Sequence, residues 1–420
     1  MSTVLSDEPA HCSVRADRAR RRNRAASFAL DASVLAALLA ASSAPTPLYS
    51  LYQDQWGLSP LAVTVVFSAY ALALLLALLT TGALSDHLGR RPVLAAALIV
   101  EATSMALLAT ADGAASLTAA RVLQGAATGV ATSAAGAAVL DLGNPQRPGR
   151  SALTNSITPV AGMATGVLAS TLLVHFAPAP TVTVYVLLAA LFVAQAIAVT
   201  FTAETAQRHT GALRSLRPRL SVPPTVRRTL LTAGTAVVAV WALGGFYSSL
   251  GPALVGLAAP DAPQAVRGMV FFTLSATAAL TVWILRRTAP LAATIGGCLP
   301  ILPATALTLS GLHGTGLPAI YGGAALAGIA FGAVSQGALR MLLASLDAHD
   351  RAATLAAYYI LSYLSMSLPA IAAGAATQHY GLGNTSQAYA IIAALLALAA
   401  LATLAASWCR AAHPADDCLR

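Results

Sequence analysis

Long apolar runs dominate this sequence of 420 residues and limit what it can fold into. Only 9% of the residues are Asp, Glu, Lys or Arg, whereas a soluble globular chain carries about a quarter. Charge this sparse cannot cover a water-facing surface of the required size, so a soluble enzyme and a disordered scaffold are both excluded. A helix that crosses a lipid bilayer needs about 20 mainly apolar residues, and the chain has room for about a dozen such helices.

Twelve apolar runs of suitable length follow one another along the chain. They cover residues 27–48, 61–83, 93–111, 116–140, 151–175, 182–202, 230–254, 266–285, 289–310, 318–345, 352–376 and 388–408. The pattern predicts an all-α membrane protein whose 12 transmembrane helices form two six-helix bundles, at 27–202 and 230–408. A polar linker at 203–229 separates the bundles, and short tails at 1–26 and 409–420 flank them.

The 24 basic residues, all of them arginines, give the chain a formal net charge of +9. Twenty-one lie in the tails, the linker and the alternate loops, which an even number of crossings places on one side of the membrane. The opposite loops hold Arg267 alone. By the positive-inside rule, both tails and the linker are therefore cytoplasmic, in a plasma (inner) membrane. Because the arginines are spread over loops rather than gathered on one face, they do not indicate nucleic-acid binding.

A weak internal repeat relates the two predicted bundles. Gly125-x3-Gly129 in the fourth run corresponds to Gly328-x3-Gly332 in the tenth. Glycines four residues apart allow membrane helices to approach one another closely. In transporters that are built from two such halves, the substrate site lies near the middle of the membrane, between the halves.

The loop between the second and third runs carries the most specific pattern, Gly-x3-Asp-x2-Gly-Arg-Arg, formed by Gly82, Asp86, Gly89, Arg90 and Arg91. Glycines permit close packing and sharp turns, and an aspartate at a helix end can pair with arginines or with the N-terminus of another helix. Such a charged knot can hold two helix ends together in one conformation and release them in another. A plain cytoplasmic loop would explain the arginines but not this spacing.

This pattern resembles the signature of the major facilitator superfamily, Gly-x3-Asp-Arg-x-Gly-Arg-Arg/Lys, and the chain is similar to that family in topology along its whole length. His87 departs from the signature, because the family has a basic residue there. A histidine weakens this charge or makes it sensitive to pH. The resemblance implies secondary active transport by alternating access, and the chain looks most like the 12-helix drug:proton antiporters.

Arg121-x2-Gln124-Gly125, at the start of the fourth run, resembles the helix-4 motif of this family. A charged residue inside a membrane span is costly to insert. Arg121 therefore either lines a watery cavity, where it holds a carboxylate or adjusts the carboxylate's proton affinity, or extends its side chain to the outer surface.

The fifth run contains Pro159-x2-Gly162, followed by Gly166, and resembles the helix-5 motif of antiporters. Thr158 stands where the motif has a glycine before the proline. The pattern favours export of the drug:proton antiporter kind. A proline-kinked helix that serves only for packing would give the same residues.

Coupling to protons requires a group that titrates inside the membrane, and two carboxyl groups fall within the predicted spans. Glu101 lies near the centre of the third run, and Asp31 lies close to the cytoplasmic end of the first. We expect Glu101 to bind the proton, with Asp31 as the second candidate. Either acid could instead be structural, Glu101 as a neutral hydrogen-bonded group and Asp31 at the lipid headgroups. Antiporters of this type often carry an acid in the middle of helix 1, where this chain has the uncharged residues 42–45.

Aromatic and polar residues within the spans are candidates to line a substrate cavity, because aromatic rings offer apolar faces with polar edges. The resemblance places this cavity among helices 1, 4, 7 and 10, with contributions from helices 2, 5, 8 and 11. The candidates are Tyr70, Gln124, Trp241, Tyr247, Gln336, Arg340, Tyr359 and Tyr363. Each could equally be a packing or interfacial residue.

The sequence favours a transporter over other classes of membrane protein. We expect proton-coupled efflux, by antiport, of a small lipophilic or amphipathic organic compound; the alternative is a proton-coupled uptake symporter for a sugar or organic acid. No segment supplies the acidic or histidine-rich cluster of a membrane enzyme, or a phosphate-binding glycine loop. A receptor of the same fold is also compatible with the motifs. We expect a functional monomer without cofactor or metal, whose partners are the substrate, protons and the lipid bilayer.

Overall fold

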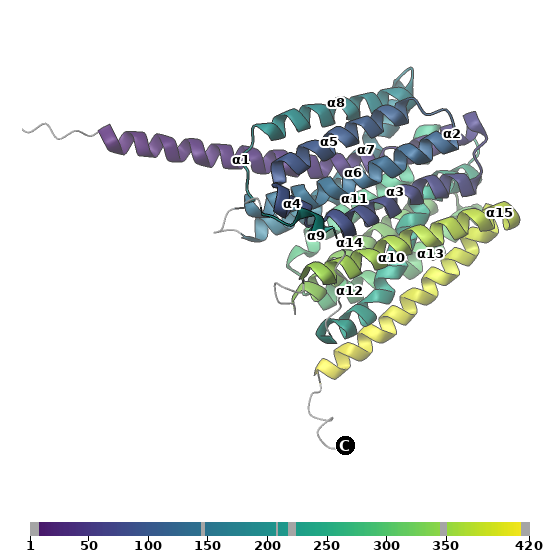
Figure 1. The fold of residues 1–420 in the computed structure, drawn as a ribbon. Coiled ribbons are helices and arrows are strands. Elements are labelled where there is room, and N and C mark those ends of the chain that lie inside the picture. The colour runs from purple at the N-terminus through teal and green to yellow at the C-terminus, as the bar shows by residue number, and fades with distance from the viewer. Residues whose placement is uncertain (1–7, 144–147, 207–208, 217–223, 345–350, 413–420) are drawn as a thin grey trace, which may run out of the picture.

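The computed structural model describes residues 8–143, 148–206, 209–216, 224–344 and 351–412, and these are almost entirely helical, with no strand in those ranges (Figure 1). The predicted tails and linker extend beyond this part, since 1–7, 217–223 and 413–420 lie outside the described residues. The prediction of an all-α fold is confirmed.

Eleven helical segments in the described part of the chain are long and apolar enough to cross a membrane. The last of them, Ala353–Ala406, has 54 residues, which is more than twice the length of about 20 that one crossing needs. It belongs to α15 (Arg351–Ala412), whose backbone breaks at Gly381 with φ 77°. Figure 1 shows α15 turning back on itself there, so that it provides two crossings. The structure thus supports the predicted count of twelve.

The helices form two bundles. The first bundle contains α1 (Glu8–Ser43), α3 (Pro60–Thr81), α5 (Arg90–Ala109), α6 (Ala114–Asp141), α7 (Pro148–Phe176) and α8 (Pro180–Thr200). In this bundle α1 packs on α7, α3 on α6, and α5 on both α6 and α8. The short α4 (Leu84–Leu88) lies in the loop before α5, and α9 (Ala212–Ser215) lies in the linker.

The second bundle contains α10 (Pro224–Ala258), α11 (Gln264–Ile284), α12 (Pro290–Cys298), α13 (Ile301–Ser310), α14 (Leu317–Ala344) and α15. The short turns η2 (Leu285–Arg287) and η3 (Gly311–Thr315) follow α11 and α13. Here α10 packs on α15, and α14 packs on α11, α12 and α13. The two bundles meet through α3 with α15 and through α7 with α11.

Prolines divide two of the predicted runs. α1 ends at Ser43, η1 (Thr46–Leu48) completes the first run, and α2 (Tyr49–Trp56) extends the helical segment beyond the predicted end at residue 48. Pro45 has no backbone N–H and its ring crowds the preceding turn, so one helix cannot continue regularly through it. Pro300 separates α12 from α13 in the ninth run for the same reason.

Side-chain hydrogen bonds between the bundles involve few groups in the described part of the chain. Ser50 Oγ donates to Gln264 Oε1 at 2.6 Å, and Gln264 Nε2 donates to Asp54 Oδ2 at 3.0 Å. Ser68 Oγ donates to the carbonyl oxygen of Ser367 at 3.2 Å. We call the end of the molecule that carries the 82–92 loop the loop end, and the other the far end. Asp54 and Gln264 lie at the far end, so this end is closed by direct contact between the bundles.

Glycines set the close approach of helices in both bundles in the same way. A Cβ atom on Gly125 would collide with the carbonyl oxygen of Tyr70 in α3, and one on Gly129 would lie 2.8 Å from the carbonyl oxygen of Leu74. In the second bundle, a Cβ on Gly328 would collide with α11. The repeat noted in the sequence is therefore a repeat of packing: α6 lies on α3 as α14 lies on α11.

Leucine in place of Gly125 or Gly328 is expected to destabilise the fold, because the added side chain meets the backbone of the neighbouring helix. Overpacking costs about 1–3 kcal/mol, so the purified protein in detergent should unfold at a temperature lower by several degrees. Gly296→Leu is the control, since an added Cβ there meets nothing within 4 Å. Equal unfolding temperatures for Gly125→Leu and the control would contradict this account of the packing.

Candidate functional site

A stripe of fully buried polar side chains runs along one face of α6. Arg121, Gln124 and Thr128 lie at positions i, i+3 and i+7, which share a face of a helix, and all three have 0% exposure. Glu101 of α5, also 0% exposed, faces this stripe. The Thr128 hydroxyl donates to its carboxylate, 3.2 Å from Oε2 and 3.4 Å from Oε1. The packing of α5 on α6 thus brings together the expected proton-binding acid and the helix-4 motif.

The Arg121 side chain points into the bundle and does not extend to the surface. Its Nη1 donates to the carbonyl oxygen of Ser42 in α1 at 3.2 Å and to Gln124 Oε1 at 2.6 Å. The guanidinium also lies over the ring of Tyr70 in α3, with Cζ 4.2 Å from the ring centroid. This cation–π contact contributes stabilisation to a cation that has lost its water.

Several donors of this cluster make no hydrogen bond of good geometry among the described residues. They are Nε and Nη2 of Arg121, Nε2 of Gln124 and the hydroxyl of Tyr70. A buried donor that is left unpaired costs about 1–3 kcal/mol, and more when the group is charged. An arrangement this costly indicates a site for a polar ligand or for water, rather than a group placed for packing alone.

Aromatic side chains of the second bundle gather on the other side of the interface. The Trp241 ring of α10 lies 5.3 Å from Phe331 of α14 and 5.3 Å from Tyr363 of α15, and Tyr359 lies 6.2 Å from Tyr363, between ring centroids. Tyr363 also packs against the cluster of Tyr70, Ala71 and Leu74 in α3 of the first bundle. The two predicted groups of residues, polar and aromatic, are therefore brought together across the bundle interface.

The structure gives Tyr247 and Arg340 contacts of their own outside this site, and it shows no contact of Gln336 with the site among the described residues. Tyr247 is buried in the second bundle, where its hydroxyl is hydrogen-bonded to Thr308 Oγ1 at 2.5 Å. Arg340 donates to the carbonyl oxygens of Leu285 and Thr288 at the loop end. Gln336 of α14 is half-buried, and its amide oxygen has no partner in the part of the chain that is described.

Asp31 is separate from Glu101. It is buried with 4% exposure and lines a narrow recess at the loop end together with Arg90, Arg91 and Leu94. The two candidate acids thus lie on different elements, α1 and α5, at different depths in the first bundle.

The 82–92 loop forms a network of charges with the ends of two helices. Arg90 pairs with Asp86 at 2.5 Å and with Asp141 of α6 at 2.7 Å, and its Nη1 donates to Ser85 Oγ at 3.1 Å. Gly89 has φ 100°, a left-handed conformation that favours glycine. The signature residues therefore tie α4, α5 and α6 together at the loop end.

Glu204, which follows α8, completes this network, and sequence reasoning did not identify it. Its carboxylate accepts the backbone N–H groups of Arg90 (2.8 Å) and Arg91 (3.2 Å), so it caps the N-terminus of α5. Asp141 was also missed. Glu204 and Asp141 could have been found from one feature of the sequence. Each is an acidic residue at the end of an apolar run, on the arginine-rich side of the membrane.

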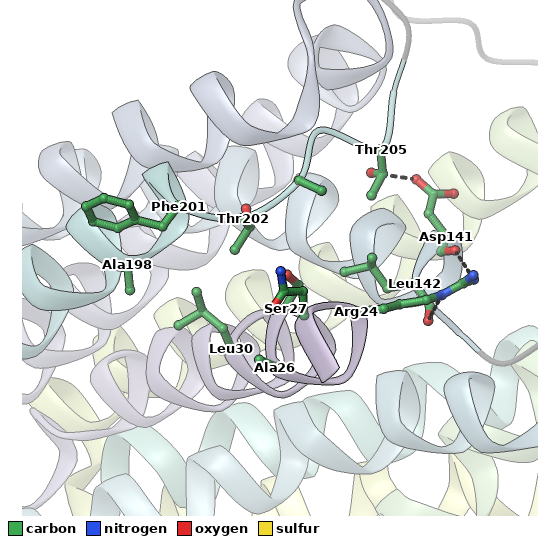
Figure 2. Close-up of a pocket in the computed structure, with 12 residues that line it drawn as sticks. Arg24, Ala26, Ser27, Leu30, Asp141, Leu142, Ala198, Phe201, Thr202 and Thr205 are labelled. Carbon is green, nitrogen blue, oxygen red and sulfur yellow. Dashed lines mark hydrogen bonds between the residues drawn. The ribbon is translucent and has the colours of Figure 1, made fainter. Parts of the chain in front are cut away.

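A surface pocket of about 770 Å³ lies beside this network, between α1, the end of α6 and the end of α8 (Figure 2). Arg24 and Asp141 form its polar wall, and Leu30 and Phe201 its apolar wall. The Arg24 guanidinium donates to the carbonyl oxygens of residues 141–143, where it caps the C-terminus of α6. Arg24 is thus engaged in holding α1 to α6.

Paired helical bundles that cross a membrane, with a buried polar site beside their interface, define the class of protein as a secondary transporter. The profile of the Major Facilitator Superfamily matches residues 32–311, and the chain belongs to this family. Members of the family are transporters rather than enzymes, bind small-molecule substrates and act as monomers. The expected family and the expectation of a non-enzyme are both confirmed.

Three solved structures illustrate the likeness of fold. The human organic anion transporter MFSD10 (TETRAN) is 20% identical with a TM-score of 0.65, over 90% of this chain and 99% of that chain. A bacterial homolog of the human lysosomal transporter Spinster, inward-facing and unoccupied, is 13% identical with a TM-score of 0.72, over 91% and 97%. The nucleoside transporter NupG is 12% identical with a TM-score of 0.68, over 91% and 98%. The comparison with curated proteins gave no match.

Removal of the Glu204 carboxylate charge is expected to loosen the loop end. Glu204→Gln weakens the cap on two N–H groups of α5, which should lower the free energy of unfolding by about 1 kcal/mol. The temperature of thermal unfolding in detergent measures this effect. Asp261→Asn, at an exposed acid, is the control. A Glu204→Gln protein as stable as this control would show that the cap contributes nothing.

Proposed function

We propose that this chain is a proton-coupled secondary transporter of a small lipophilic or amphipathic organic compound, working by alternating access in the plasma (inner) membrane. The observation that carries the proposal is Glu101, a fully buried carboxyl that accepts from the Thr128 hydroxyl and lies close to the Gln124 amide and to Arg121. Burial in a low-dielectric region favours the neutral form of a carboxyl, and a nearby cation favours the ionised form. Since Arg121 lies on the facing stripe of α6, any change in how Arg121 is engaged changes the proton affinity of Glu101.

The two sides of the bundle interface suit an amphipathic compound. The first bundle offers the unpaired polar groups around Arg121, and the second offers the rings of Trp241, Tyr359 and Tyr363. Aromatic faces accommodate apolar groups of varied shape. Tyr70 lies between the two sides, since its ring lies against Arg121 and its cluster in α3 packs against Tyr363. We infer that substrate binds here when the bundles move apart.

The arginine distribution supports an orientation with the loop end and both termini in the cytoplasm. In this orientation, the bonds from Gln264 to Ser50 and Asp54 close the outer end. We infer that the network of Asp86, Arg90 and Glu204 holds the cytoplasmic ends of the first bundle as one unit while the bundles rock. Asp31, which lies beside Arg90 and Arg91, is the second candidate for a proton-binding group.

Two observations favour different senses of coupling. The Pro159-x2-Gly162 pattern favours efflux by antiport. In the structure an added Cβ on Gly162 or Gly166 would collide with the backbone of α1. These glycines therefore allow α7 to pack closely on α1. The unpaired donors of Arg121 favour the second candidate, a proton-coupled symporter, because they would hold a substrate such as an organic acid.

Glu101→Gln is expected to abolish accumulation of substrate driven by a pH gradient, because an amide cannot release or take up the proton. Exchange of labelled for unlabelled substrate at equal pH should persist, since it needs no net proton movement. Both are measured as flux in proteoliposomes, with Asp31→Asn as the matched variant that tests the second acid. Full uphill transport by Glu101→Gln would remove this residue from the coupling mechanism.

The sense of coupling can be read from the same proteoliposomes. With a pH-sensitive dye inside, an outward substrate gradient should draw protons inward if the protein is an antiporter. It should carry protons outward if the protein is a symporter. Substrate flux without any proton movement would contradict the proposal of proton coupling.

A further inference from the structure

We propose that the buried, unpaired edge of the Arg121 guanidinium, with the Gln124 amide beside it, is a subsite for a single negative charge, so that the substrate is an organic monoanion such as a monocarboxylate. This inference rests on the proposed function and names its substrate class. It starts from which nitrogen atoms of Arg121 are free.

A guanidinium group has five N–H donors in a rigid plane. In Arg121, Nη1 is engaged with the carbonyl oxygen of Ser42 and with Gln124 Oε1. Nε and Nη2 make no hydrogen bond of good geometry among the described residues, and the Tyr49 hydroxyl is the group nearby that could accept from them. These two nitrogens form one edge of the guanidinium, and their N–H groups point the same way. That edge matches the two oxygens of a carboxylate in a bidentate pair.

The protein itself does not fill this edge. The ion pairs that occur in the described part of the chain both involve Arg90, at the loop end. Glu101 accepts from Thr128 and has no hydrogen bond to Arg121 in that part. A buried arginine that serves as a structural ion pair would have its acceptor in place, because an unpaired buried charge is strongly unfavourable. The missing anionic acceptor is therefore supplied by a ligand.

Adjacent groups extend the subsite and limit what fits it. The amide nitrogen of Gln124, which lies close to Glu101, adds a neutral donor beside the guanidinium, and the Tyr70 hydroxyl adds another. Arg121 is the one cation of this cluster in the described part of the chain, so a monoanion is neutralised, whereas a dianion would leave a buried excess charge. Tyr363 packs against the cluster that contains Tyr70, and the Trp241 ring lies next to Tyr363. The part of the substrate that carries the anionic group is therefore apolar or aromatic.

The charges of the site link anion binding to proton binding. When Glu101 is ionised, the charges of Arg121 and Glu101 sum to zero, and a bound anion would add an unneutralised charge inside the protein. When Glu101 is protonated, the charges of the anion and Arg121 sum to zero. The other titratable groups that face Arg121 are phenols, on α2, α3 and α8: Tyr49, Tyr52, Tyr70 and Tyr185. Anion and proton therefore favour each other's binding, and by linkage each raises the affinity for the other. This selects symport, the second of the two senses of coupling.

The test uses the full-length purified protein and three sets of matched probes that differ mainly in charge. Each set contains a carboxylate, its amide and its amidine: benzoate, benzamide and benzamidine, the corresponding 2-naphthyl compounds, and the corresponding octanoyl compounds. Binding is followed by quenching of tryptophan fluorescence and by thermal stabilisation. At least one carboxylate should bind with at least tenfold higher affinity than its amide and its amidine. Equal or tighter binding of the amidine in every set would overturn the anion subsite.

Variants then locate the binding site. Arg121→Gln should weaken carboxylate binding at least tenfold, and Arg121→Lys should also weaken it because lysine lacks the bidentate edge. Arg267→Gln is the matched control, since Arg267 donates to backbone carbonyl oxygens at the far end. If Arg121→Gln does not fold, Gln124→Leu is used, for which a threefold or greater loss of carboxylate affinity is expected. Carboxylate affinity that is unchanged in all folded variants would overturn the proposal.

Proton uptake separates failure of this inference from failure of the proposed function. In weakly buffered solution, carboxylate binding should be accompanied by uptake of protons by the wild type, and Glu101→Gln should bind the carboxylate without this uptake. Binding that depends on Arg121 but takes up no proton in the wild type would retain the anion subsite and refute proton coupling. Proton release on amidine binding, with no carboxylate binding, would retain proton coupling and refute the anion subsite.

Discussion

The close approach of α6 to α3 at Gly125 and Gly129 is the contact on which the candidate site depends. In a bilayer, helices gain little from the hydrophobic effect when they associate, so van der Waals contact between closely packed backbones provides much of the attraction. The absence of a side chain at Gly125 lets α6 reach the Tyr70 backbone. The same approach sets the Tyr70 ring beneath the Arg121 guanidinium. The packing glycines thus create the dry surroundings in which a single charge has a large effect.

Much of this fold could be predicted from residue patterns, because membrane helices are determined by local composition. The apolar runs gave the helices, and the Gly82 to Arg91 spacing indicated the family. Helix boundaries differed from the prediction where apolar composition favoured one continuous helix but a proline interrupted it. Pro45 and Pro300 divide apolar runs in this way. Gly381 separates two crossings with one positive-φ residue, and it lies in the polar gap between the apolar runs at 352–376 and 388–408, so this boundary could be predicted.

The site was only partly predictable, because its contacts join residues far apart in the chain. Arg121 and Gln124 could be assigned together, since they lie within one turn of one helix. That Glu101 faces Thr128 depends on how each helix is rotated about its axis, which the apolar pattern leaves open when a helix is apolar on nearly all sides. That Glu204 caps α5 depends on the path of the chain after α8, which the apolar pattern does not describe. The unknown rotation of the helices also explains why Tyr247 and Arg340 could not be separated from Trp241 and Tyr363 beforehand.

The internal repeat has a consequence for how the two halves diverged. If Gly125 is aligned with Gly328, Arg121 corresponds to Ala324 and Thr128 to Phe331. The halves therefore share the same arrangement of small residues, whereas the ionic group occurs in the first copy only, with Ala324 at the matching place in the second and the Phe331 ring at the place of Thr128. Such a duplicated protein can specialise each copy without altering how either copy folds. One copy then retains the chemistry, and the other is free to evolve towards new molecular shapes.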